Sequence, residues 1–145
     1  MKCKIYLAGK MNGLSFEEMN NWRNEVFQKL LSLSEMYNIK LNVVNPVLYY
    51  NFEEKRHQTE IEVEEFDLAH VISSDIIIVN LNGLKDSIGT IIELHDAHYH
   101  HKIPVIAFGD KELFNNLHPW VKNDITRVEN NINDVVTYIR DFYMF

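Results

Sequence analysis

The chain contains few cysteines and few basic residues, and each shortage excludes a structural feature or a class of partner. Cys3 is the single cysteine, so an internal disulfide is excluded, and we expect a buried thiol in the first apolar run. Lysines and arginines number 14 against 21 aspartates and glutamates, and the net charge of -7 argues against a nucleic-acid polymer as partner. A single nucleotide needs only a few donors, so this composition is compatible with one.

Long apolar runs and glycine-rich motifs are also lacking. No apolar stretch approaches membrane-spanning length and the N-terminus lacks a signal-peptide pattern, so we expect a cytoplasmic protein without a membrane partner. The first strand is followed by neither G-x-G-x-x-G nor a P-loop lysine. A phosphate-accepting receiver domain needs acidic residues after the first predicted strand and an aspartate ending the third. The chain has Gly9-Lys10 and Asn80 there.

What the chain does contain is an alternation of strand and helix patterns over its 145 residues, which fits a single domain, 1–145. Ser15 followed by Glu18 is a capping-box signature and predicts the start of the first helix. Pro119 interrupts the segment 111–122, whose structure stays ambiguous. Strands are predicted at 4–8, 40–45, 75–81, 103–108 and 125–129, and further helices at 60–73, 88–100 and 132–142.

Strands that alternate with helices predict a parallel sheet between two helix layers. We predict an α/β fold of flavodoxin-like or Rossmann-like type, a three-layer sandwich with a five-stranded parallel sheet in the order 2-1-3-4-5. Ligands of such sheets bind at the carboxyl ends of the strands, where the strand order reverses. This rule selects the loops 9–14 and 80–90 as the walls of the site.

The most informative segment runs from Asp86 to Glu93, because it follows a buried strand and opens a helix. Gly89 allows backbone to approach a ligand closely, and Ser87 and Thr90 offer hydroxyls that can cap the helix, where anions are favoured. We expect the helix dipole to keep Glu93 ionised, as attack on an anomeric carbon requires. On this feature alone, a charge that stabilises the helix is the simpler interpretation.

Two further residues are predicted to reach the same site. Tyr6, near the end of the first strand, is placed to hold or orient Glu93, although a core aromatic gives the same pattern. Asp67 lies in the helix before the third strand and can reach the cleft from there. Asp75, eight residues later, is interpreted as a structural residue that starts the strand.

These residues carry a resemblance to a known family. Three blocks carry it: Tyr6-Leu7-Ala8-Gly9, Asp67 eight residues before Asp75, and Ser87-x-Gly89-Thr90-x-x-Glu93. They resemble the nucleoside 2-deoxyribosyltransferase family, with its related nucleoside 5′-monophosphate N-glycosidases. The resemblance implies that Glu93 is a nucleophile forming a glycosyl-enzyme intermediate, that Tyr6 positions it, and that Asp67 orients or protonates the departing base. It implies no metal and no organic cofactor.

The implied activity is cleavage of the N-glycosidic bond of a nucleoside or nucleoside 5′-monophosphate. Transfer of the sugar to a free nucleobase, in nucleotide salvage, is the first prediction. Hydrolysis of 5′-monophosphates and a non-catalytic nucleotide-binding module are the alternatives. Transferases of free nucleosides carry an aspartate six residues before the nucleophile, where this chain has Ser87, which suits a phosphate better. Against the hydrolase, the basic residue of its first loop is unmatched at Asn12, although Lys10 is nearby. His95 replaces a usual small residue.

The remaining predictions concern binding and assembly. Tyr49 and Phe52, in the long segment 47–59, are predicted to stack on the base, although such aromatics as often pack on their own core. A homo-oligomer, a dimer or higher, is implied by the resemblance alone, with Asn123 and Asp124 in the region that would reach across. We expect the histidines at 95, 98, 100 and 101 to form a solvated or subunit-contact surface and not a metal site. The predicted substrate-binding residues are Gly9, Lys10, Asn12, Tyr49, Phe52, Asp86, Ser87, Gly89, Thr90 and Asn123.

Overall fold

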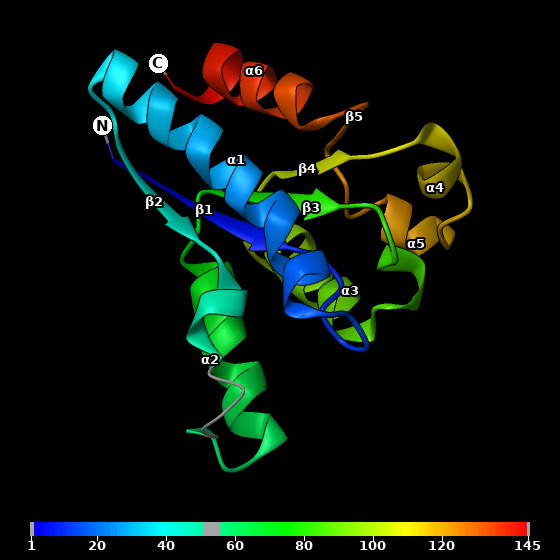
Figure 1. Cartoon of the computed structure of the whole chain (residues 1–145). Coiled ribbons are helices and arrows are strands. Elements are labelled where there is room, and N and C mark those ends of the chain that lie inside the picture. Colours follow the sequence, from blue (N-terminus) through cyan, green and yellow to red (C-terminus); the bar gives the residue numbers. More distant parts are fainter. Residues whose placement is uncertain (1, 51–55, 145) are drawn as a thin grey trace.

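A computed structural model of the chain describes residues 2–50 and 56–144. In this part of the chain a five-stranded sheet runs in the order β2-β1-β3-β4-β5, with every neighbouring pair parallel (Figure 1). The predicted fold class and strand order are confirmed. The strands are β1 (Lys2–Ala8), β2 (Lys40–Val44), β3 (Ile76–Asn80), β4 (Val105–Phe108) and β5 (Arg127–Glu129).

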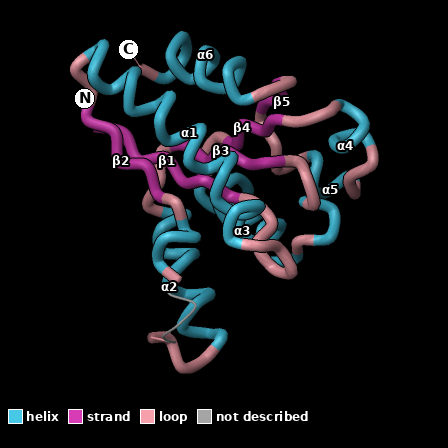
Figure 2. Tube along the Cα trace, in the orientation of Figure 1, coloured by secondary structure: helices cyan, strands magenta, loops and turns pink. Residues whose placement is uncertain are grey.

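Helices cover both faces of the sheet. In Figure 1, α1 and α6 lie on one face, and α2, α3 and α5 lie on the other. The first turns of α2 extend beyond the edge of the sheet (Figure 2). The helices are α1 (Phe16–Tyr37), α2 (Glu60–Ile72), α3 (Ile88–His95), α4 (Lys111–Asn115), α5 (Pro119–Lys122) and α6 (Ile132–Tyr143), with short turns η1 (Pro46–Tyr49), η2 (Leu84–Asp86) and η3 (Asp96–His100).

Alternating side chains of each strand enter two separate cores. Along β1, Ile5 and Leu7 pack in the cluster under α1 and α6. Tyr6 and Ala8 point the other way and join the cluster under α2 and α3. This alternation puts the Tyr6 side chain on the sheet face that also carries α2 and α3, the helices of Asp67 and Glu93.

Local signals in the sequence describe most element boundaries correctly. Ser15 Oγ accepts a hydrogen bond from the Glu18 amide at 3.2 Å, and the Glu18 side chain accepts one from the Ser15 amide at 3.3 Å, so the predicted capping box starts α1. The Asp75 side chain accepts from the Lys4 amide at 2.8 Å, which joins the starts of β1 and β3 and supports its structural interpretation. Cys3 is buried as expected, and burial raises the pKa of its thiol to about 11.

Two predicted segments differ in detail from the structure. The helix expected over 88–100 is α-helical only to His95 and continues as a π-helical turn, in which His101 Nδ1 lies 2.9 Å from the Asp96 carbonyl oxygen. The ambiguous segment 111–122 forms two short helices, with Pro119 at the first turn of the second. Across residues 2–50 and 56–144, no helix combines the length and apolar character that a bilayer crossing requires.

Candidate active site

Two adjoining cavities lie between α2, α3 and the loop after β1. The smaller has a volume of about 230 Å³ and the larger about 850 Å³, and both are bounded by Glu60, Val63 and Asp67. The larger volume falls within the ~300–1,000 Å³ typical of small-molecule sites. The smaller cavity is further lined by Glu64, Leu68, Gly89, Ile92 and Glu93, and the larger by Met11, Asn12, Gly13, Leu14, Met19, Tyr49, Tyr50, Arg56, His57, Gln58 and Thr59.

Glu93 brings a carboxyl group to the wall of the smaller cavity. Its Oε2 atom is buried and has no hydrogen-bond partner among the described residues. Burial raises the pKa of Glu93 to about 8; the Asp67 charge adds to this effect, whereas a hydrogen bond with Tyr6 and the charge of Arg23 oppose it. The expectation that the helix dipole keeps this group ionised is therefore wrong. Glu93 lies beyond the first turn of α3, where the dipole has faded and desolvation dominates.

Tyr6 contacts Glu93 from the end of β1. Its side chain is 1% exposed, and burial, followed by the negative charge of Glu93, raises the pKa of the phenol. The hydroxyl therefore keeps its proton at any ordinary pH and serves as a donor to the Glu93 carboxylate. The structure thus brings together the pair that the sequence placed at this site.

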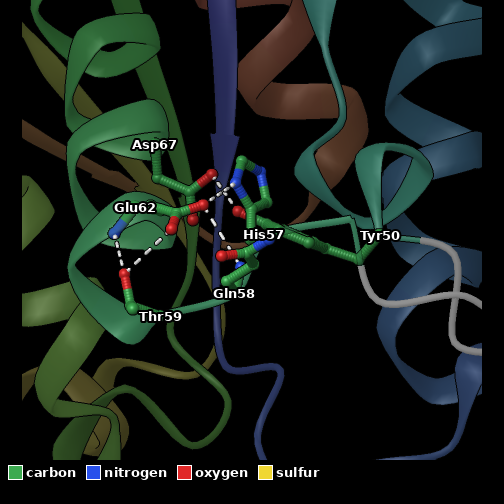
Figure 3. Close-up of polar contacts among 6 residues, drawn as sticks. All are labelled: Tyr50, His57, Gln58, Thr59, Glu62 and Asp67. Carbon is green, nitrogen blue, oxygen red and sulfur yellow. Dashed lines mark hydrogen bonds and ion pairs between the residues drawn. The ribbon is translucent and has the colours of Figure 1, made fainter.

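Asp67 lies on α2 at the junction of the two cavities. The Tyr50 hydroxyl donates a hydrogen bond of 2.5 Å to Asp67 Oδ1, and in Figure 3 these two side chains point toward each other. Burial raises the pKa of Asp67, and the Tyr50 hydrogen bond opposes that rise. The carboxyl group therefore retains a proton to higher pH than an exposed aspartate does.

The chain that leads into α2 is held by Glu62 (Figure 3). The Gln58 amide donates to Glu62 Oε2 at 3.2 Å, and His57 Nδ1 lies 3.7 Å from the same oxygen. Thr59 caps α2 by accepting from the Glu62 amide at 3.4 Å. These contacts position residues 57–59, which line the larger cavity.

Several solved structures have a fold similar to that of this chain. A conserved protein from Enterococcus faecalis V583 superposes with a TM-score of 0.71 at 19% identity, covering 97% of this chain and 99% of that chain. A 2-deoxyribosyltransferase from Bacillus psychrosaccharolyticus gives 0.64 at 22% identity, covering 93% and 91%. The CMP N-glycosidase BcmB from Clostridium botulinum gives 0.50 at 12% identity, covering 96% and 99%.

The chain has their fold. The predicted resemblance to nucleoside 2-deoxyribosyltransferases and related N-glycosidases is thus confirmed at the level of the fold. No protein-family model matches the chain, and no curated protein does either.

Among the predicted substrate-binding residues, Asn12, Tyr49 and Gly89 line the two cavities. The Tyr49 ring also stacks on the His70 ring, with centroids 5.2 Å apart, so part of its surface packs on α2. Phe52 lies outside the described residues. The other predicted binding residues line neither cavity: Gly9, Lys10, Asp86, Ser87, Thr90 and Asn123.

Ser87 and Thr90 bond to each other at the start of α3. Their hydroxyl oxygens are 2.7 Å apart, and the Ser87 side chain makes no capping bond to the helix. The expected cap is therefore absent. Lys10 lies alongside the preceding turn, because a Cβ atom added at Gly83 would be 2.6 Å from its Cδ.

Asp124 does not reach outward as the sequence interpretation suggested. Its side chain is 6% exposed, and its Oδ2 lies 2.8 Å from Nδ1 of His95 on α3 of the same chain. This contact connects the segment after α5 to the end of α3. The neighbouring residue Asn123 is exposed. Among the described residues, no group of three or more histidine, cysteine, aspartate or glutamate side chains is arranged to hold a metal ion.

Two residues of the site escaped the sequence interpretation. Tyr50, the partner of Asp67, was passed over in favour of Tyr49, because adjacent tyrosines in a loop carry no signal of which one turns inward. Arg23 is 0% exposed and donates to the Leu7, Met19 and Gly9 carbonyls at 3.2, 2.6 and 2.9 Å. The signal for Arg23 was its position, since 19, 23, 26 and 30 form one buried row of α1.

Arg23 also explains Gly9, which faces α1 and not a ligand. A Cβ atom at position 9 would lie 2.7 Å from the Trp22 ring and 3.3 Å from the Arg23 guanidinium. Glycine is therefore needed for close packing of α1 on the end of β1. Burial lowers the pKa of Arg23 to about 10, while the neighbouring acidic groups of Tyr6 and Glu93 oppose that change.

Proposed function

We propose that this chain is an enzyme that cleaves the N-glycosidic bond of deoxynucleosides and transfers the sugar to another base, with Glu93 as covalent nucleophile. The observation that carries the proposal is the buried, unpartnered Oε2 of Glu93 on a cavity that Asp67 also lines. A buried acceptor without a partner costs roughly 1–3 kcal/mol, so its presence indicates an atom reserved for a ligand. The fold shared with a 2-deoxyribosyltransferase supports this choice.

The reaction uses two carboxyl groups in sequence. A Glu93 oxygen attacks the anomeric carbon, the carbon–nitrogen bond breaks with its electron pair on the base, and the Asp67 proton moves to the departing base. An incoming base then attacks the same carbon through nitrogen, the ester bond to Glu93 breaks, and the proton of that nitrogen returns to Asp67. Tyr6 orients Glu93, and Tyr50 orients Asp67.

The protonation state needed for this reaction follows from the coupling of the two acids. The charge of Asp67 raises the pKa of Glu93, so ionisation of one group makes ionisation of the other harder. Over an intermediate pH range the pair therefore holds a single proton. In the site without substrate, burial outweighs the Tyr6 hydrogen bond and the Arg23 charge and keeps the proton on Glu93. The proposal therefore requires that bound substrate favour ionised Glu93 and leave the proton on Asp67, where the departing base needs it.

A nucleoside 5′-monophosphate N-glycosidase is the second candidate. Ser87 in place of an aspartate favours it, as does the fold shared with a CMP N-glycosidase. Arg56 and His57 line the larger cavity and support an anionic group there. In this version water attacks the glycosyl ester, its proton goes to Asp67 and the sugar phosphate leaves. On the resemblance alone, we further propose a cytoplasmic homo-oligomer that works in nucleotide salvage.

A product assay tests the proposal. Purified protein is incubated with deoxynucleosides and with their 5′-monophosphates, each with and without a second free base, and products are separated by chromatography. New nucleoside that appears only when a base is supplied supports the transferase. Free base released from monophosphates alone supports the hydrolase, and no turnover of any substrate by folded protein leaves a non-catalytic binding module.

A further inference from the structure

One face of α2 carries three carboxylates, at Glu60, Glu64 and Asp67. All three line the smaller cavity, and Glu93 on α3 lines it as well. The spacing i, i+4, i+7 places the three side chains in one row along the helix. None of the described residues that line this cavity is basic. The cavity thus presents four carboxyl groups and no cation.

Helix stability does not account for this row. Like charges at i, i+4 destabilise a helix by roughly 0.2–0.5 kcal/mol per pair. The helix dipole favours Glu60 in the first turn, but Glu64 and Asp67 lie beyond it. Glu62, in the same acidic run, has a structural task because it bonds the Gln58 amide and the Thr59 hydroxyl. Within residues 2–50 and 56–144, Glu64 makes no such bond.

The atom Glu93 Oε2 adds an independent observation. It is buried and unpartnered among the described residues, and its side chain lines the same cavity. Ionised carboxylates only accept hydrogen bonds, so Glu60 and Glu64 offer this cavity acceptors without matching donors. A ligand group that fits must therefore bring N–H donors or a positive charge, and hydrogen bonds of that kind to charged acceptors are the stronger ones.

We propose that the smaller cavity binds the nucleobase and selects bases with an exocyclic amino group, with Glu64 and Glu60 as the residues that read that group. Cytosine and adenine present N–H donors at the edge where uracil and hypoxanthine present a carbonyl oxygen. A carboxylate accepts from the former and repels the latter. That the ligand is a nucleoside rests on the proposed function. The same charge excludes a 5′-phosphate from this cavity.

The test measures binding, so that it does not depend on turnover. In a Glu93→Ala background, which leaves the nucleoside intact, dissociation constants are measured by calorimetry for deoxycytidine against deoxyuridine and for deoxyadenosine against deoxyinosine. We expect the amino-bearing member to bind about 10–100-fold more tightly, the worth of one hydrogen bond to a charged group. Adding Glu60→Gln and Glu64→Gln should reduce each ratio to about threefold or less.

Glu65→Gln is the matched control, because Glu65 is an exposed neighbour in the same acidic run that lines neither cavity. It should leave both ratios unchanged. Equal affinities for the paired nucleosides, a preference that survives both glutamate substitutions, or no binding of any nucleoside would overturn the inference. Turnover by the unaltered chain without base preference would leave the proposed function standing. A preference in binding without turnover would reject the enzyme and keep the base selection.

Discussion

Arg23 and Glu93 both bring an ionisable group into the interior beside β1, from helices on opposite faces of the sheet. All three guanidinium nitrogens of Arg23 donate to backbone carbonyls. Glu93 keeps its Oε2 atom without a partner among the described residues. A buried charge that the protein satisfies by itself is part of the architecture. A buried polar atom without a hydrogen-bond partner lowers the stability of the fold, and a ligand that bonds to this atom restores the lost free energy.

Removal of the unsatisfied charge should have the largest effect on activity. In Glu93→Gln the side chain keeps its shape but loses the nucleophilic oxygen, so we expect turnover to fall by about 10³-fold or more. Rates of product formation measured under single-turnover conditions check this, with the melting temperature as the control for folding. A rate within tenfold of the parent would remove Glu93 from the mechanism.

Removal of the satisfied charge should act on stability instead. Arg23→Met leaves the Leu7, Met19 and Gly9 carbonyls without their donor, and we expect a loss of about 3 kcal/mol or more in the free energy of unfolding. Urea denaturation measures it. Arg140→Met is the matched control, because the Arg140 side chain is 39% exposed and its Nε pairs with neighbouring Asp141 at 2.8 Å, so the midpoint of this variant should stay at the parent value. Equal midpoints for the two variants would contradict the comparison.

The cost of the Glu93 charge should appear as a dependence of stability on pH. Its pKa is about 8 in the folded chain against an ordinary 4.5, so the folded state binds the proton more tightly. Stability therefore falls as pH rises from about 4.5 to about 8 and levels off above. The free energy of unfolding of Glu93→Gln should therefore rise relative to that of the parent as pH increases, with a difference on the order of 2 kcal/mol at pH 9. Parallel stability curves for the two proteins would show that burial does not penalise this carboxylate.

The smallest effect is expected from Tyr50→Phe, which removes the hydrogen bond to Asp67 and keeps the ring. Since that bond lowers the pKa of Asp67, its loss should move the alkaline limb of the kcat/KM profile upward. It should also reduce kcat/KM by roughly tenfold through loss of orientation. Tyr49→Phe is the control, because Tyr49 stacks on His70 and should leave the limb in place. If both variants shift the limb alike, Tyr50 does not act through Asp67.

The fold was predictable because its signals are local or periodic. The Ser15–Glu18 capping box involves four consecutive residues, and it formed as expected. The apolar run before Asn80 indicated a strand covered on both faces, and β3 is buried throughout. The strand-order rule then directed attention to Tyr6 and Glu93, which the structure brings into contact.

The protonation of Glu93 was not predictable in the same way. The helix dipole is a local effect and pointed to an ionised group, whereas burial depends on every segment packed around the side chain. Tyr49 and Tyr50 show the same limit of sequence-based prediction, because the sequence does not indicate which of the two adjacent side chains reaches Asp67. The turn η1 ends at Tyr49, and the hydroxyl that reaches Asp67 is that of Tyr50, the next residue. Asp124 likewise turned inward to His95 across 29 positions of sequence.

The sequence by itself determined the order of elements, the sheet type and the segment that carries the site, since hydrophobic periodicity and capping are written in neighbouring residues. Only the tertiary structure decided which charges are satisfied. In the folded chain Arg23 donates to three carbonyls, and Glu93 Oε2 has no hydrogen-bond partner among the described residues. Four carboxyl groups line one small cavity. Hydrogen-bond satisfaction and desolvation depend on atoms distant in the chain, and folding alone brings those atoms together.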